Sequence, residues 1–314
     1  MISIGKILGA ILLGIGLYSL VFGVIVSKPL SVGVFDRVYT TKKDYGNKID
    51  GPKIIVAGGS GPFYSVRCEV IQTETNLPCV NISIAIALGR ETILEQAKQV
   101  AKPGDIVLLP WEFRLYFLDA DKMRARISYP YIIRHEKKLI SALGFDHFSH
   151  ALFYFDLKFL FNALLETSRF AAGKRHGFDA DGRLTSNGDY QGHTAKVSEK
   201  FTEKLAALDS AALETPKIAA LEEPPSRLPK FFKWAATNNV RVLGTLPASF
   251  NTSPIDVAAV EKIQAWYGDH AEFFVLDNFS QYPKSCFYDT REHLNEECQI
   301  QHSKFIAAAL IERL

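Results

Sequence analysis

Short apolar runs bounded by glycine and proline recur along the chain and predict the strands of a buried sheet. Three lie at residues 53–57, 79–84 and 106–109, and two more lie at 240–246 and 273–276. Apolar runs of about four to eight residues with such flanks are typical of strands covered on both faces. We therefore expect an α/β fold, with a parallel sheet and helices on both of its faces.

Segments between these runs have the pattern and length of helices. Helices are expected at 63–76, 91–100, 228–238, 255–267 and 303–314. Residues 113–230 lack this alternation of strands and helices, so we interpret them as a helical insertion within one domain that spans 51–314. The chain shows no internal repeat.

The N-terminal residues predict a membrane segment. Residues 7–26 form a run of twenty residues without a charge, which as a helix spans roughly 30 Å, the thickness of a bilayer core. A cleaved signal peptide is the alternative, since Lys6 supplies a positive start. The run is longer than a usual signal core and no small-x-small site follows it. We expect an uncleaved transmembrane signal anchor at 1–27 and a polar linker at 28–50.

The orientation of this anchor is indicated by two opposing signals. Basic residues follow the apolar run, which by the positive-inside rule favours a cytoplasmic domain: they are Lys28, Arg37, Lys42 and Lys43. The cysteines favour export, because an even, locally paired set suits an oxidising compartment. The pairs are Cys68 with Cys79 and Cys286 with Cys298. Four reduced, buried thiols are the alternative. We expect two disulfides and an exported domain.

Residues 151–165 form a second strongly apolar segment, in which Asp156 and Lys158 are the only charges. It is too short and interrupted for a second membrane span. A core helix is one interpretation, and a helix that lies on the membrane surface or faces a partner is the other.

Composition narrows the function classes. The 314 residues are 47% hydrophobic and 22% charged, which is typical of a globular protein. Net charge is +2, from 36 basic and 34 acidic residues. A general nucleic-acid surface needs a concentrated positive excess, so we expect no nucleic-acid partner.

Ser60 is the first candidate for chemistry. It follows the first predicted strand directly, in the turn Gly58-Gly59-Ser60-Gly61-Pro62. Ligands of open α/β folds bind at this carboxyl edge. Glycines let the backbone bend there and leave room for a substrate. Free N–H groups at the start of the next helix stabilise an oxyanion formed when the serine attacks a carbonyl. A helix N-cap serine is the alternative.

Asp289 and His293 are the second candidate. They lie four residues apart in a predicted loop before the last helix, between Cys286 and Cys298. A serine nucleophile needs a base, and the base benefits from a carboxylate that orients it. Alternatives are an ordinary surface loop and a pair of metal ligands, although no third ligand is evident.

Together these stretches resemble the SGNH hydrolase superfamily. Closer still are the membrane-anchored SGNH-like proteins of exopolysaccharide O-acetylation, such as the alginate acetylation proteins, and the D-alanylation protein of Gram-positive walls. The resemblance covers about 75 residues, in KIIVAGGSGPFYSVRCEVIQTETNLPCVNISI, KPGDIVLLPWEF and CFYDTREHLNEEC.

The resemblance implies a role for each matching residue. Ser60 is the nucleophile, His293 the base and Asp289 the carboxylate. The N–H groups of Ser60 and Gly89 are oxyanion donors. The family's third block, Gly-x-Asn-Asp, is replaced by Pro-Trp-Glu at 110–112, so one side-chain oxyanion donor is absent. Asn81 is a substitute by residue type. The spacing DxxxH also departs from the commoner DxxH. Both departures weaken the expectation of efficient hydrolysis more than that of acyl transfer or binding.

The expected function is transfer of an acyl group, namely acetyl, to a cell-surface polysaccharide, without a metal or diffusible cofactor. By resemblance, a membrane-bound O-acyltransferase delivers the acyl group, and the domain lies in the periplasm on a single-pass inner-membrane anchor. Two alternatives stay open: a non-catalytic assembly or polysaccharide-binding subunit, and a tethered carbohydrate esterase.

Overall fold

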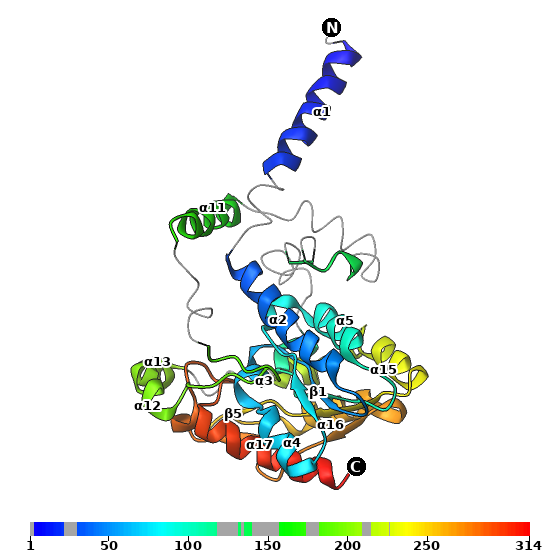
Figure 1. Ribbon diagram of the computed structural model, residues 1–314, viewed down its shortest axis with the longest axis vertical. Coiled ribbons are helices and arrows are strands. Elements are labelled where there is room, and N and C mark those ends of the chain that lie inside the picture. Colours follow the sequence, from blue (N-terminus) through cyan, green and yellow to red (C-terminus); the bar gives the residue numbers. More distant parts are fainter. Residues whose placement is uncertain are drawn as a thin grey trace. The chain divides into compact units, whose positions relative to one another are not determined.

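The computed structural model describes residues 3–21, 30–117, 131–132, 135–139, 157–173, 182–208, 215–225 and 227–314 (Figure 1). The chain forms two compact units. The first consists of Met1–Arg37 and Asp121–Asp181, and the second of Val38–Ala120 and Gly182–Leu314. The single domain expected at 51–314 is therefore divided, since residues 121–181 group with the N-terminal segment.

A five-stranded parallel sheet forms the centre of the second unit. Its spatial order is β2-β1-β3-β4-β6. This is the order of a doubly wound sheet, in which the chain reverses its direction of winding between β1 and β3 and ligands bind at the carboxyl ends there. The strands are β1 (Ile54–Val56), β2 (Cys79–Asn81), β3 (Ile106–Leu109), β4 (Arg241–Thr245) and β6 (Glu272–Phe274).

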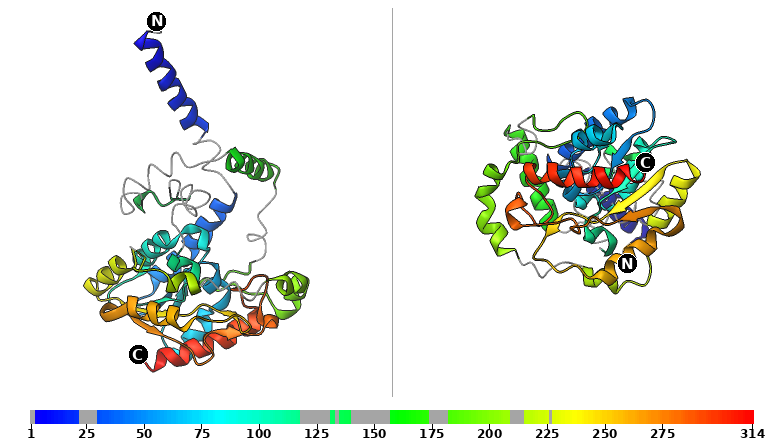
Figure 2. Two further views of the ribbon diagram at one scale, coloured as in Figure 1. Left: turned by 180° about the vertical axis from the view of Figure 1, so that it is seen from behind. Right: turned by 90° about the horizontal axis from the view of Figure 1, so that it is seen from below.

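Helices cover both faces of this sheet, as the sequence predicts (Figures 1 and 2). Successive strand residues point to opposite faces, so Ile55 and Ile54 belong to different hydrophobic clusters. The cluster with Ile55 packs against α5 (Arg90–Val100), α15 (Arg227–Thr237) and α16 (Val257–Tyr267). The cluster with Ile54 packs against α4 (Cys68–Thr75) and α17 (Glu296–Ile311).

The helix predicted at 63–76 is two helices, α3 (Ser60–Ser65) and α4. The break lies where side chains from distant parts of the chain form hydrogen bonds with the backbone. Asn81 Nδ2 donates to the carbonyl of Val66 at 3.0 Å, and the N–H of Arg67 donates to Ser303 Oγ at 2.7 Å. Because these partners come from β2 and α17, a local helical pattern could not reveal the break.

The remaining elements of the second unit are short. Two of them, β5 and β7, form a separate parallel pair that the sequence did not predict. In chain order the elements are η2 (Ile86–Leu88), α6 (Phe113–Phe117), α12 (Ala195–Ser198), η4 (Glu199–Phe201), α13 (Thr202–Ala207), α14 (Thr215–Ala219), β5 (Ser249–Phe250), η5 (Gly268–His270), β7 (Gln281–Tyr282) and η6 (Lys284–Cys286).

The polar linker expected at 28–50 is wrong, because Leu30–Lys48 forms helix α2. Its residues from Val38 onward belong to the second unit, and Tyr39 and Lys42 are fully buried there. Lys42 Nζ donates to the Ser83 carbonyl and lies 3.9 Å from the centre of the Phe63 ring. Burial lowers the pKa of Lys42 well below its usual range. A buried lysine gives this helix a polar sequence although one side of it is packed.

In the first unit, α1 (Ile4–Val21) is long and apolar enough to cross a membrane, and all of its side chains are exposed. Residues 22–27 of the expected anchor lie outside the described residues. Helix α11 (Leu157–Ala171) covers part of the apolar segment expected at 151–165, whose residues 151–156 also lie outside the description. Phe161, Leu164 and Leu165 on α11 are exposed, and Ala163 is buried.

Candidate active site

Ser60 is the first residue of α3, directly beyond the carboxyl end of β1. Gly59 occupies the N-cap position and Ser60 makes no capping bond, so the N-cap interpretation of this serine is wrong. Ser60 is partly exposed, and among the described residues neither its hydroxyl nor its N–H has a hydrogen-bond partner. The serine therefore keeps both groups available at the edge where the sheet reverses its winding.

The glycines around Ser60 make room for protein groups, although the sequence suggested room for a substrate. A Cβ on Gly59 would lie 2.3 Å from Oε1 of Glu112 and 2.7 Å from the backbone nitrogen of Ile86. A Cβ on Gly58 would lie 2.4 Å from the ring of Pro62. Real Cβ contacts are not this short, so the turn accepts no side chain at either position.

Glu112 fills this space from the carboxyl end of β3. Its Oε2 accepts the N–H of Gly59 at 3.1 Å, and its Oε1 accepts the N–H of Gly61 at 2.7 Å. The side chain is fully buried. Burial raises the pKa of Glu112, and the N–H groups of Glu112 itself, Gly61 and Gly59 oppose that shift. Glu112 thus binds the backbone on both sides of Ser60.

Asp289 and His293 form a hydrogen-bonded pair. His293 Nδ1 lies 2.7 Å from Asp289 Oδ1. When Nδ1 carries the proton it donates to the carboxylate, and Nε2 remains the acceptor nitrogen. Burial alone would raise the pKa of Asp289, but the hydrogen bond and charge of His293, together with nearby Lys204, outweigh it and the pKa is lowered. Asp289 is therefore ionised at neutral pH and suited to orient the imidazole.

Tyr64 brings this pair to the helix that Ser60 begins. The His293 ring stacks on the Tyr64 ring, with centroids 4.3 Å apart and planes inclined by 19°. Tyr64 lies four residues after Ser60 in α3, which places it about one turn further along the helix. The sequence alone does not single out Tyr64, since an aromatic residue one turn beyond a serine carries no signal by itself.

Ser60, Asp289 and His293 line one cleft of about 290 Å³. The serine and the acid–base pair, which are more than 220 residues apart in the sequence, thus face a common space. No hydrogen bond joins Ser60 to His293 in this structure. The other lining residues are Ile86, Phe113, Arg114, Lys204, Leu208, Thr290, Arg291 and Glu292.

Two of the expected oxyanion donors are wrong. The N–H of Gly89 donates to the Ile86 carbonyl at 3.0 Å, because η2 closes on this residue. Both hydrogens of Asn81 Nδ2 are used within the fold, by the carbonyls of Pro62 and Val66. Ser60 keeps its N–H, as expected. The backbone N–H of Ile86, a residue that lines the same cleft, lies against Gly59 and has no partner among the described residues.

Both expected disulfides are present. Cys68 is bonded to Cys79 and Cys286 to Cys298, with Cα–Cα distances of 5.0 and 5.5 Å. The second bond closes the loop that carries Asp289 and His293. Within that loop Phe287 and Leu294 form an isolated antiparallel bridge. The disulfide and the bridge fix the spacing of the acid–base pair.

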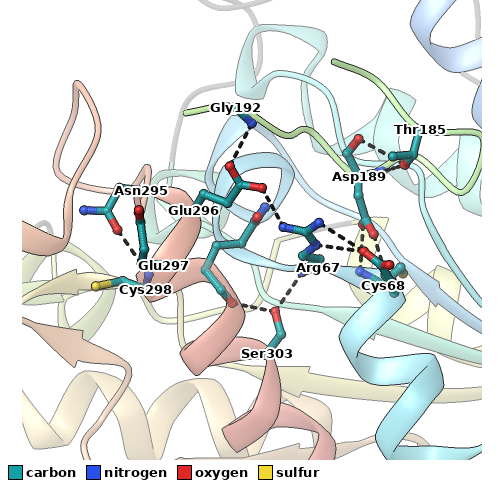
Figure 3. Close-up of polar contacts among 12 residues, drawn as sticks. Arg67, Cys68, Thr185, Asp189, Gly192, Asn295, Glu296, Glu297, Cys298 and Ser303 are labelled. Carbon is teal, nitrogen blue, oxygen red and sulfur yellow. Dashed lines mark hydrogen bonds and ion pairs between the residues drawn. The ribbon is translucent and has the colours of Figure 1, made fainter. Parts of the chain in front are cut away.

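A polar network joins the first turns of α4 and α17 through residues 182–195 (Figure 3). The Asp189 carboxylate accepts the N–H of Cys68 at 2.7 Å. The Glu296 carboxylate accepts from Arg67 at 2.8 Å and from the N–H of Gly192 at 2.9 Å. These bonds connect the serine side of the site to the histidine side.

In the described part of the chain, no group of three or more His, Cys, Asp or Glu residues is arranged to hold a metal ion. Comparison with family models, curated proteins and solved structures finds no match for this chain.

Proposed function

We propose that this protein is an exported, membrane-anchored, SGNH-like serine acyltransferase. It transfers an acetyl group to a cell-surface polysaccharide together with a membrane-bound O-acyltransferase. The observation that carries the proposal is the shared cleft, in which Ser60 faces the Asp289–His293 pair at the carboxyl edge of a parallel sheet. The resemblance to the SGNH superfamily selects acyl chemistry among the reactions of activated serines.

In the proposed reaction, Asp289 holds the Nδ1 proton of His293 and leaves Nε2 as the base. Ser60 Oγ bonds to the acyl carbon, the donor's bond to that carbon breaks, and the serine proton passes through His293 to the leaving group. A sugar hydroxyl then attacks the serine ester. Its proton passes through His293 back to Ser60 Oγ as the ester bond breaks. The N–H groups of Ser60 and Ile86 serve as the oxyanion donors.

The membrane part of the proposal follows from the supply of acyl groups. Helix α1 is long and apolar enough to span a bilayer, and the two disulfides favour an oxidising compartment such as the periplasm. Charged cytoplasmic acetyl donors do not cross hydrocarbon unaided. A serine outside the cytoplasm therefore needs a membrane protein to deliver the acyl group, and an anchor raises its local concentration there. The exposed apolar residues of α11 offer a further surface for lipid or partner contact.

The first experiment incubates the full-length protein in detergent with an activated acetyl ester, with and without oligosaccharide. We expect acetyl on Ser60 by peptide mass spectrometry and, with acceptor present, on sugar. Ser60→Ala should abolish both. Thr290→Ala removes another hydroxyl from the same cleft and should retain activity. Acetyl on neither Ser60 nor sugar would refute the transferase.

The second experiment tests the membrane partner. Residues 1–27 are replaced by a cleavable export signal, and polysaccharide acetylation is measured in cells at native expression. We expect acetylation to fall strongly, because the freed domain no longer concentrates at the membrane. Full acetylation would show that no membrane partner is needed.

A non-catalytic subunit is the second candidate, and two observations favour it. Ser60 and His293 are not hydrogen bonded, and Glu112 replaces the asparagine donor of the family. This candidate predicts polysaccharide binding without acetyl on Ser60 in any arm of the first experiment. A tethered esterase predicts acetyl-Ser60 that is released to water at the same rate with and without oligosaccharide.

A further inference from the structure

Glu112 is a buried carboxyl group whose hydrogen bonds, among the described residues, all come from backbone N–H groups. It is fully buried, and among the described residues no lysine, arginine or histidine pairs with it. Burying a carboxyl without a cation is unfavourable unless hydrogen bonds compensate. Here the compensating donors are the N–H groups of Gly59 and Gly61, the two neighbours of Ser60, together with that of Glu112 itself.

The turn is shaped around this side chain. At Gly59 an added Cβ would collide with Glu112 Oε1, and at Gly61 it would lie 2.9 Å from Glu112 Cγ. The two glycines and the glutamate therefore fit each other, although about fifty residues separate them along the chain. Glu112 does not line the cleft, so it does not reach a substrate bound there.

Each oxygen of the carboxyl group serves a different amide. Oε2 binds the residue before the serine and Oε1 binds the residue after it. The amide between them, that of Ser60, is left without a partner among the described residues. Of the three successive amides in the turn, Glu112 therefore leaves only that of Ser60 available at the start of α3.

We propose that Glu112 is a positioning residue that fixes the Ser60 turn, so that the hydroxyl and N–H of Ser60 both serve the acyl group in the cleft. This inference rests on the proposed serine chemistry. In this role Glu112 acts by holding the backbone around Ser60, and it does not contact the oxyanion itself.

Glu112→Gln is the main test, because glutamine keeps the shape but offers one acceptor oxygen where the turn uses two. At a temperature where circular dichroism shows the variant folded, we expect kcat for acetylation of Ser60 to fall on the order of 100-fold. KM for the acetyl ester should stay within about twofold, since Glu112 does not line the cleft. Glu91→Gln is the matched control, as another buried glutamate outside this turn.

Hydrogen exchange supplies a readout that does not depend on activity. In Glu112→Gln, the amides of Gly59 and Gly61 should exchange faster than in the wild type, while those of β4 keep their rates. Unchanged exchange in the turn, or a folded variant with wild-type kcat, would overturn the positioning role. A rise in KM without a fall in kcat would overturn it as well.

Two outcomes are kept apart by this design. If the wild type places no acetyl on Ser60, the proposed function fails, and the exchange rates still decide whether Glu112 holds the turn. If Glu112→Gln does not fold, Gly61→Ala replaces it, because the added Cβ displaces the carboxyl group. That variant should show the same loss of kcat and the same faster exchange at Gly59.

Discussion

Ser60 lies in a turn that packing holds, whereas Asp289 and His293 lie in a loop that a covalent bond holds. Around Ser60, Gly58, Gly59 and Gly61 leave no space for a Cβ. The acid–base loop is partly exposed, and the Cys286–Cys298 disulfide closes it. The serine region also contains a disulfide, Cys68–Cys79, but this bond lies between α4 and β2, beyond the turn itself.

This difference separates two ways of fixing a reactive group. A turn between two strands of a doubly wound sheet is surrounded by protein, so close contacts define its shape. The loop before the last helix is partly exposed, and the Cys286–Cys298 disulfide and the Phe287–Leu294 bridge hold it. Disturbing the packing should therefore affect the serine, and cutting the covalent bond should affect the histidine.

The largest effect is expected from Gly59→Ala. Its Cβ would collide with Glu112 Oε1 and with the backbone nitrogen of Ile86, which cannot rotate away. We expect kcat for Ser60 acetylation to fall on the order of 100-fold and the free energy of unfolding to fall by about 3 kcal/mol. Enzyme kinetics and chemical denaturation measure the two quantities.

Gly33→Ala is the control for this variant. Gly33 lies in α2, and its added Cβ would come no closer than 3.8 Å to another atom. Alanine favours helix, so we expect no loss of activity and unchanged or slightly higher stability. If Gly59→Ala behaved in the same way, the turn would not be held by packing.

Removing the disulfides one at a time should distinguish the two regions more finely. The cysteines are 11 residues apart in one pair and 12 in the other. Because loop-closure entropy depends on this length, either double alanine variant should lose about 3 kcal/mol of unfolding free energy. Only Cys286→Ala/Cys298→Ala should lower kcat by about tenfold at a temperature where both variants are folded. Equal losses of kcat in both would contradict the comparison.

Acid should weaken the fold through a buried histidine beside the acid–base loop, with the smallest effect of the three: His302 bonds to Tyr282, which packs with Cys286 and Phe287. Burial lowers the pKa of His302 in α17 to about 3. The unfolded chain binds this proton below about pH 6.5, whereas the folded chain does not until about pH 3. The stability that His302 contributes is therefore complete above pH 6.5 and is lost as the pH falls. It amounts to about 2 kcal/mol between pH 6.5 and pH 5.

Asp289 titrates in a lower window. Its folded pKa is lowered, so its contribution is present above about pH 3.9 and is lost only below that. Urea denaturation at several pH values measures the unfolding free energy, and Tyr282→Phe/His302→Phe, which removes both partners of one hydrogen bond, should reduce its slope against pH. Burial also lowers the pKa of His193, to about 4, so His193 accounts for the slope that remains. His270 is exposed, so His270→Gln should leave the pH dependence of the unfolding free energy unchanged. If the unfolding free energy of the double variant changes with pH as it does in the wild type, His302 is not the cause of the change.

Sequence predicted the elements that depend on local pattern. The run at 106–109 is β3, the runs at 53–57, 79–84 and 240–246 contain β1, β2 and β4, and the run at 273–276 overlaps β6. Apolar residues flanked by glycine and proline suffice for a strand buried on both faces. The cysteine pairs were also predictable, since each disulfide joins two cysteines that follow one another in the order of the four cysteines along the chain.

Features that depend on distant partners were not predictable. The break at Val66 and Arg67 needs side chains from β2 and α17. The packed side of α2 contains Lys42, whose charge suggested a solvated linker. Glu112 was visible as a departure from the family pattern, but its role depends on where its carboxyl group reaches. Gly89 and Asn81 had suitable residue types, yet their hydrogens are occupied inside the fold.

The pairing of the cysteines also bears on how the chain is made. Four cysteines allow three connectivities, and this protein joins the first to the second and the third to the fourth. Synthesis runs from the N-terminus to the C-terminus, so Cys68 and Cys79 are made long before Cys286 and Cys298. Closing a short loop also costs less entropy than closing one of more than 200 residues. The direction of synthesis thus selects the native pairing, and this arrangement makes no demand for later disulfide exchange.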